Sequence, residues 1–276
     1  MIMTMQPLAQ TDKPMTAALL KGTQVETRIA PVRLRAQGIT IAFGGQQVLR
    51  DVDVELYGGQ IALLRGPNGS GKTTLLNILS SFLRPDAGQA TLSINGRTVN
   101  ILRQTPDRLA RLGIVRLWQD IRLFPTMTVL ENVIAASPHA LGIHPFAALF
   151  VPGKVRRQEK AFREQAMQWL NLLGMAERAH SSGDKLSVGQ SKRVAIARML
   201  QTGGQVLLLD EPLAGLDHES ADKLVNDLNR LADTTHKAML VVEHNHDAIT
   251  PVCDIRLTLD EGQLHREELK GQTWAC

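Results

Sequence analysis

The spacing of apolar positions changes several times along the chain, and each change predicts a different kind of element. Between residues 32 and 64 apolar and polar residues alternate, and the pairs Gly44-Gly45 and Gly58-Gly59 interrupt the alternation. This pattern predicts short β-strands joined by glycine turns. The pair Asn95-Gly96, within the run 91–99, is a strong signal for a type I′ turn, so we expect a hairpin there.

Other stretches are largely apolar without alternation, which is typical of strands buried on both faces. They comprise 61–64, 206–209 and 238–242, and 112–117 is a further short apolar run. Apolar residues at helical spacing predict helices over 74–79, 156–173, 191–200 and 220–231. The run Thr128-Val129-Leu130-Glu131 has the pattern of a capping box that opens a further helix. Strands and helices that alternate in this way predict an α/β fold with a mostly parallel core sheet.

Residues 66–73 form the pattern G-x-x-x-x-G-K-T between the apolar strand and the helix 74–79. This context distinguishes a phosphate-binding loop from an ordinary glycine turn. The glycines let successive backbone N–H groups point inward around a triphosphate. We expect Lys72 to contact the β- and γ-phosphates and the Thr73 hydroxyl to bind Mg²⁺. The residues assigned to the nucleotide here are Gly66, Asn68, Gly69, Ser70, Gly71, Lys72, Thr73 and Thr74.

Two of the buried strands are followed directly by polar residues. Asp210-Glu211 follows the run 206–209, and Glu243-His244 follows 238–242. Ligands of open parallel sheets bind at the carboxyl ends of the strands. We therefore expect Asp210 to hold Mg²⁺ directly or through water, and Glu211 to polarise an attacking water as general base. The same position makes His244 a candidate for a γ-phosphate contact.

Composition narrows the class of protein. The chain has 276 residues, 43% of them hydrophobic and 21% charged, and no apolar run approaches the roughly 18 residues that span a bilayer. Of the formal net charge of +4, we place most in residues 1–36, outside the expected fold, so no basic nucleic-acid face is implied. Two cysteines, Cys253 and Cys276, favour reduced thiols. Nothing in residues 1–32 has the pattern of a signal peptide, and we interpret them as a loosely ordered extension.

The motifs together resemble those of the ATP-binding cassette (ABC) family over residues 37–265. They stand in the family's order: the phosphate loop, Gln119, the signature Leu186-Ser187-Val188-Gly189-Gln190, Asp210-Glu211, Asp217 and His244. The resemblance implies a P-loop NTPase fold with an antiparallel β subdomain and an inserted helical subdomain. We expect the ATPase core over 33–118 and 186–276, and the helical subdomain over 119–185.

The resemblance also implies ligands and roles. ATP and Mg²⁺ are the expected ligands, with Gln119 near both the ion and the γ-phosphate. Ser187 alone would indicate only a capped helix. In the family, however, the signature closes over ATP held by another subunit, so Ser187, Gly189, Gln190 and Asp217 are assigned to the nucleotide across a head-to-tail homodimer or heterodimer. Phe43 either stacks on the adenine or belongs to the core.

A narrower similarity concerns the ATPase subunits of branched-chain amino acid, urea and amide importers. It is carried by residues 112–116, 121–124, 127–129 and 131–133. It implies transmembrane permease subunits as partners, a peripheral place on the cytoplasmic face of the cell membrane, and no direct nucleic acid. We expect the stretch from Asp120 to about Arg157, with Phe124, Phe146, Leu149 and Phe150, to dock on a permease, although these residues could instead pack the helical subdomain.

The alternative is a soluble ABC ATPase that acts in iron–sulfur assembly, or on DNA or ribosomes. DNA-repair cassettes have long heptad helices between phosphate loop and signature, and none is present between Lys72 and Leu186. Translation-factor cassettes carry two cassettes, and this chain has one. One local expectation concerns Val188: a β-branched residue should keep a negative φ, which leaves Gly189 to allow close backbone approach to a γ-phosphate.

Overall fold

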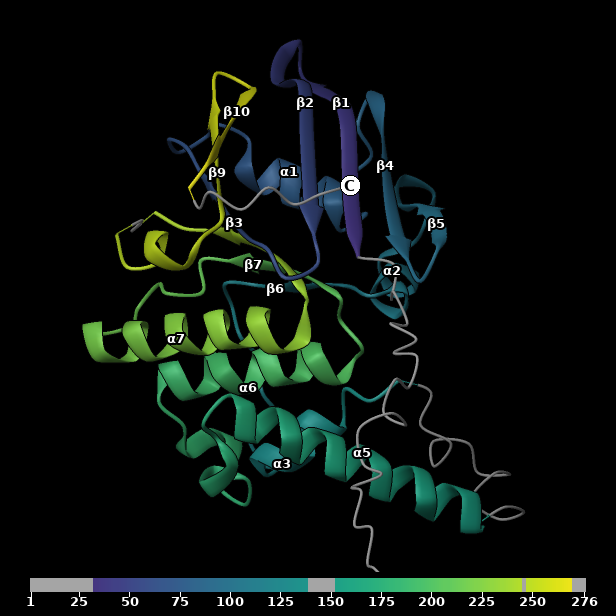
Figure 1. Ribbon diagram of the computed structural model, residues 1–276, viewed down its shortest axis with the longest axis vertical. Coiled ribbons are helices and arrows are strands. Elements are labelled where there is room, and N and C mark those ends of the chain that lie inside the picture. The colour runs from purple at the N-terminus through teal and green to yellow at the C-terminus, as the bar shows by residue number, and fades with distance from the viewer. Residues whose placement is uncertain (1–31, 139–151, 245–246, 270–276) are drawn as a thin grey trace, which may run out of the picture.

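The structure is a computed structural model that describes residues 32–138, 152–244 and 247–269. The expected extension lies outside this part except for Val32, as do Phe146, Leu149 and Phe150 of the expected docking stretch. Figure 1 shows an antiparallel sheet on one side of a larger core sheet, and helices α6 and α7 on the other side. Helices α3 and α5 lie beyond α6, furthest from the antiparallel sheet (Figure 1).

The antiparallel sheet has four strands in the order β2-β1-β4-β5. Their bounds are β1 (Arg33–Phe43), β2 (Gln46–Tyr57), β4 (Ala87–Ile94) and β5 (Arg97–Asn100). Asn95 and Gly96 join β4 to β5 with φ of 51° and 75°, the two positive values that a type I′ turn requires. The hairpin predicted from Asn95-Gly96 is therefore confirmed.

The core sheet has six strands in the order β10-β9-β3-β8-β7-β6. Their bounds are β10 (Gln263–Glu268), β9 (Ile255–Asp260), β3 (Ile61–Arg65), β8 (Ala238–Val242), β7 (Val206–Asp210) and β6 (Ile114–Leu117). Every neighbouring pair from β9 to β6 is parallel, and β10 alone runs antiparallel, to β9. The mostly parallel core sheet is confirmed, but the pattern of apolar residues did not predict its last two strands, β9 and β10.

The continuous apolar runs have a simple origin, because both faces of the core sheet are covered. Leu207 and Leu209 of β7 belong to the cluster shared with α6 and α7. Val206 and Leu208, one residue away, belong to the cluster shared with α1 and the antiparallel sheet. Successive side chains of a strand point to opposite faces, so a strand between two layers must be apolar at every position.

The helices are α1 (Lys72–Leu79), α2 (Pro106–Leu112), α3 (Val129–Ile134), α5 (Pro152–Leu172), α6 (Val188–Gln201) and α7 (His218–Thr235). Short 3₁₀ turns lie at Ile101–Arg103, Ala176–Arg178, Gly183–Lys185 and Thr250–Val252. The capping box predicted at Thr128 and Glu131 is present at the start of α3. Helices α5, α6 and α7 begin two to four residues before the predicted starts at 156, 191 and 220, because Pro152, the exposed Val188 and His218 do not extend the apolar spacing. Helix α2 was not predicted; it begins after Thr105 and ends at Gly113, whose φ is 106°.

Part of the charge assignment was wrong. Arg33 and Arg35, which we counted as outside the fold, lie in β1, and both form ion pairs with Glu55 of the neighbouring strand. Opposite charges across adjacent strands stabilise the pairing of β1 with β2. The division of the chain at residues 32, 118 and 185 stays a prediction.

Lys237, between α7 and β8, offers a test of the packing. Its side chain is buried, with the ammonium 5.8 Å from the centre of the Trp169 ring, and burial lowers the pKa of Lys237 to about 8. A lysine with a lowered pKa in the folded state binds its proton more tightly when the chain is unfolded, so folding is penalised at neutral pH. We expect Lys237→Met to raise the free energy of unfolding by roughly 2 kcal/mol near pH 7.

Urea unfolding at a series of pH values checks this prediction. Between pH 8 and the ordinary lysine pKa of 10.5, the stability of the parent should rise as the folded state loses its proton first. The difference in free energy of unfolding between Lys237→Met and the parent should therefore shrink over that interval. If this difference is the same at both ends of the pH interval, the buried charge of Lys237 is not the cause of the lower stability.

Candidate active site

Five parallel strands of the core sheet end at one edge, and the site lies at the ends of four of them, β3, β8, β7 and β6. In the register of the sheet, Leu64 of β3 lies beside Val242 of β8, which lies beside Asp210 of β7, and Leu117 of β6 lies beside Leu209. The residues that come directly after the four strands are the phosphate loop, Glu243-His244, Glu211 and Trp118-Gln119. Parallel pairing thus brings together residues that are far apart in the sequence.

The phosphate loop joins β3 to α1 and depends on its glycines. A Cβ atom at Gly66 would lie 2.1 Å from the Leu259 carbonyl oxygen, and one at Gly71 would lie 2.9 Å from the Leu49 side chain. Gly71 is the N-cap of α1 with φ of 104°. Gly69, with φ of 79°, has no atom within 4 Å of a Cβ position. The first and last glycines are therefore required by packing, and the middle one by its backbone conformation.

The polar residues of the loop differ in exposure. Lys72 is buried, and its ammonium donates to the carbonyl oxygens of Gly66 and Pro67, both at 2.8 Å. Burial lowers the pKa of Lys72, while Glu211 and Asp210 act in the opposite direction. The hydroxyl of Ser70 is buried without a hydrogen-bond partner in the described part of the chain. Asn68 and Thr73 are exposed, and Thr74 is half-buried.

The structure brings the three predicted catalytic residues into contact. Gln119 donates from Nε2 to one carboxylate oxygen of Glu211 at 3.1 Å, and His244 Nε2 lies 3.1 Å from the other oxygen. Glu211 has φ of 49°, a value that non-glycine residues adopt mainly at functional sites and in turns. The side chain of Glu211 thus lies directly between the ends of β6 and β8.

Asp210 has a different partner, which the sequence did not indicate. Its Oδ2 accepts a hydrogen bond from the guanidinium of Arg116 at 2.6 Å. Arg116 lies in β6, whose apolar run we interpreted without giving this residue a role. A charged side chain inside such a run was the available signal, because a buried charge requires a partner.

Two more buried charges next to the site were missed. Lys192 of α6 donates to the carbonyl oxygens of Glu211 and Ala214, at 3.1 and 2.6 Å. Glu243 accepts from the backbone N–H of Leu213 at 2.6 Å, and burial raises the pKa of Glu243 to about 7. Both side chains hold the segment after Asp210. The position of Glu243 beside His244 was visible in the sequence, but which backbone atoms it would bind was not.

The signature lies at the start of α6. Ser187 is its N-cap, its hydroxyl accepts from the Gln190 backbone N–H, and the Gln190 side chain accepts from the Ser187 backbone N–H. Val188 is not among the residues with positive φ, so that prediction is confirmed, and its side chain is 56% exposed. Gly189 is buried, and its Cβ position points at Ser220 of α7, 3.3 Å from that residue's Cβ, so its small size also serves packing within the chain. Its expected close approach to a γ-phosphate stays a prediction.

Asp217 and Phe43 stand apart from the catalytic contacts. Asp217 is the N-cap of α7, where its two carboxylate oxygens accept from the backbone N–H and the hydroxyl of Ser220, and these bonds lower its pKa. Phe43 ends β1 and is 48% exposed, so it does not belong to the buried core, and its stacking on an adenine stays a prediction. Among the described residues, neither Ser187 nor Asp217 forms a hydrogen bond to the phosphate loop. Their assignment to a nucleotide stays a prediction.

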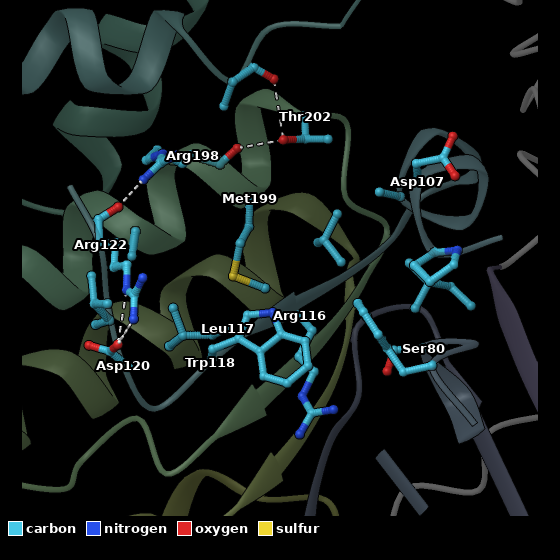
Figure 2. Close-up of a pocket in the computed structure, with 18 residues that line it drawn as sticks. Ser80, Asp107, Arg116, Leu117, Trp118, Asp120, Arg122, Arg198, Met199 and Thr202 are labelled. Carbon is cyan, nitrogen blue, oxygen red and sulfur yellow. Dashed lines mark hydrogen bonds and ion pairs between the residues drawn. The ribbon is translucent and has the colours of Figure 1, made fainter. Parts of the chain in front are cut away.

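A cavity of about 750 Å³ lies beside this edge, on the other side of β6. Figure 2 shows Trp118 and Leu117 on its wall, opposite Met199 of α6 and its C-cap residue Thr202, with Asp107 of α2 at one end. Arg122 and Asp120 form an ion pair at the other end, where Arg198 donates to the Arg122 carbonyl oxygen. Trp118 is 44% exposed and contacts Phe82 edge to face, with ring centres 5.1 Å apart. The cavity is apolar along its walls and charged at its rim.

Comparison with known proteins places these features in a family. Residues 49–214 match the ABC transporter family. The chain is 33% identical to the high-affinity branched-chain amino acid transport ATP-binding protein BraF of Pseudomonas aeruginosa over 83% of this chain and 88% of the relative. It is 32% identical to LivG of Escherichia coli, a protein of the same description, over the same shares of the two chains.

Solved structures agree with this assignment. A nucleotide-free ATP-binding cassette from an ABC transporter superposes with a TM-score of 0.70 at 30% identity, over 86% of this chain and 91% of the other. A dimeric cassette in a post-hydrolysis state, bound to ADP and phosphate, superposes with a TM-score of 0.65 at 25% identity, over 87% of this chain and all of the other. The chain belongs to the ABC transporter family and is one of its ATP-binding, ATP-hydrolysing subunits.

Proposed function

We propose that this ATPase drives uptake of a branched-chain amino acid or a similarly small solute, such as urea or an amide, with Glu211 as the general base of ATP hydrolysis. The observation that carries the catalytic part is the pair of contacts that Gln119 and His244 make to the two oxygens of Glu211. The choice of solute rests on the named function of BraF and LivG and on the length over which they match. The soluble alternative, in assembly or on nucleic acid, is not favoured by these relatives.

The contacts support a separate role for each of these residues around the γ-phosphate. With its proton on Nε2, His244 donates to Glu211 and orients the carboxylate, and Gln119 does so from the opposite side. A carboxylate held in this way can accept a proton from water without first reorganising. Lys72 carries its charge on the same edge, where it would attract the phosphates. Ser70, with a buried hydroxyl that lacks a partner in the described residues, would hydrogen-bond within the same cradle.

The residues present fit a magnesium ion bound together with phosphates. No group of three or more acidic, histidine or cysteine side chains able to hold a metal occurs in the described ranges 32–138, 152–244 and 247–269. Mg²⁺ commonly binds one or two carboxylates, waters and substrate phosphates, so a site of few protein ligands suits it. Asp210, the exposed Thr73 hydroxyl and Gln119 would hold the ion. When bound, it neutralises charge on the phosphate oxygens.

The proposed active unit is a dimer. Ser187 is exposed at the N-terminus of α6, whose first N–H groups and dipole favour an anion. A cassette of similar fold is dimeric with ADP and phosphate bound. We propose that Ser187, Gln190 and the backbone at Gly189 close over the nucleotide of a second cassette, and that Asp217 borders the same interface.

The cavity beside Trp118 is the proposed docking site for a permease subunit. Among the described residues, no helix is both long enough and apolar enough to cross a membrane. Trp118, Phe82 and Phe124 are large apolar side chains left exposed at or near this cavity, which fits an apolar helix segment from a partner. Docking there would hold the subunit at the cytoplasmic face of the cell membrane. The stretch proposed from Asp120 onward contributes Asp120, Ile121 and Arg122 to the lining.

Glu211→Gln tests the assignment of the base. The amide keeps the shape of the side chain but accepts no proton from water, so we expect ATP hydrolysis to fall by about a hundredfold or more while ATP affinity remains. Lys72→Ala should instead weaken ATP binding, because it removes a charge from the phosphate site. Equilibrium binding and single-turnover hydrolysis distinguish the two. Parental turnover in Glu211→Gln would mean that Glu211 is not the base.

Gly189→Asp tests the proposed dimer. The new side chain meets Ser220 within the chain and adds negative charge at the start of α6, so we expect ATP-dependent dimerisation to be lost. ATP binding by the monomer should persist, since the phosphate loop lies on other elements. Val188→Gly, at an exposed neighbouring position, is the control and should dimerise. Sedimentation with a non-hydrolysable ATP analogue measures both, and unchanged dimerisation of Gly189→Asp would refute the interface.

Cysteine crosslinking tests the docking site. In a chain whose native cysteines are replaced by serine, Arg122→Cys at the rim of the cavity should crosslink to a membrane subunit in native membranes. Lys223→Cys, exposed on α7, serves as the matched control and should not. The proposal fails if the cavity position never reaches a membrane protein while the transporter is assembled.

A further inference from the structure

Arg116 is a buried cation at the centre of the site. Its side chain is only 3% exposed, and the side chain of its partner Asp210 is 15% exposed. One terminal nitrogen donates to Asp210 Oδ2 and the other to Asn77 Oδ1 of α1, both at 2.6 Å. The guanidinium also lies 4.0 Å from the centre of the Trp118 ring. Figure 2 shows it directed away from Met199.

The sheet register explains this contact. Arg116 of β6 is paired with Leu208 of β7, so Asp210 lies two residues further along and on the same face. The guanidinium reaches it diagonally, while Asn77 of α1 and Trp118, two residues further along the chain, contact it from other directions. A planar fork with three fixed contacts has little freedom to turn, unlike an exposed arginine.

This arrangement constrains what Asp210 can offer to a metal ion. A guanidinium 2.6 Å from Oδ2 occupies that oxygen and places a permanent positive charge against it. A second cation is repelled from Oδ2, which leaves Oδ1 as the available ligand. Carboxylates bind Ca²⁺ through one or both oxygens, at longer distances and with loose geometry, whereas Mg²⁺ requires a tight octahedron with few protein ligands.

We propose that Arg116 is a positioning residue that limits Asp210 to a single available oxygen and thereby sets the preference of the nucleotide site for Mg²⁺ over Ca²⁺. The proposal rests on the assignment of Asp210 to the metal made above. Arg116 itself need not touch nucleotide or ion. Its effect is transmitted through the orientation and charge of one carboxylate.

The test uses the full chain with a non-hydrolysable ATP analogue and bound Mn²⁺. A competing ion displaces the Mn²⁺, and electron paramagnetic resonance measures how much Mn²⁺ stays bound. Mg²⁺ and Ca²⁺ are titrated separately, and the ratio of their competition constants is the readout. Arg116→Gln frees Oδ2, so we expect the ratio to shift toward Ca²⁺ by about tenfold. Arg116→Lys keeps the charge but loses the planar fork, so it should shift less; it also serves if Arg116→Gln does not fold.

Arg193→Gln is the matched control. Arg193 forms a similarly buried ion pair with Asp227, at 2.8 Å, between α6 and α7 and away from Asp210. The Arg193→Gln substitution should lower the free energy of unfolding and leave the ratio of the Mg²⁺ and Ca²⁺ competition constants unchanged. An unchanged ratio in Arg116→Gln, or an equal shift in Arg193→Gln, would overturn the proposal. If Asp210→Asn binds Mn²⁺ as tightly as the parent, the assignment of Asp210 to the metal is wrong, and the role of Arg116 falls with it.

Discussion

The parallel hydrogen bonding of β6, β7, β8 and β3 is the constraint on which the site depends. Because the strands run in one direction and in register, their carboxyl ends meet at one edge, and each end delivers a polar residue to it. A slip of one residue in β7 would turn Leu209 from one apolar layer to the other and move both carboxylates. Because β7 and β8 are closely packed on both faces, such a slip would force both layers to repack, and this cost fixes the geometry of the site.

Asp210 and Glu211 are adjacent in the chain but have separate partners. Asp210 ends β7 with the orientation of a strand residue and meets Arg116, a permanent cation. Glu211 leaves the strand with a positive φ and meets Gln119 and His244, which carry no fixed charge. The two carboxylates therefore have different surroundings, which supports the proposal that Asp210 faces a metal ion and Glu211 faces the attacking water.

The sequence predicted most of this edge, because apolar runs and short motifs determine which strands are buried and which polar residues stand at their ends. It failed where a role depends on contacts between distant elements. Arg116 acts only because β6 pairs with β7, and the size of Gly189 matters because α7 packs against α6. The helix starts at Val188 and His218 were missed since neither residue continues an apolar face. The caps Ser187 and Asp217 mark those starts better than the apolar spacing does.

The four residues 116–119 connect the two halves of the proposed function. Arg116 holds Asp210, Leu117 and Trp118 line the cavity, and Gln119 donates to Glu211. Trp118 also lies against the Arg116 guanidinium and against Phe82. Because these residues are consecutive, a partner in the proposed docking cavity would contact residues bonded directly to those that hold Asp210 and Glu211. The cavity and the two carboxylates are thus joined by a short path of covalent bonds and direct contacts.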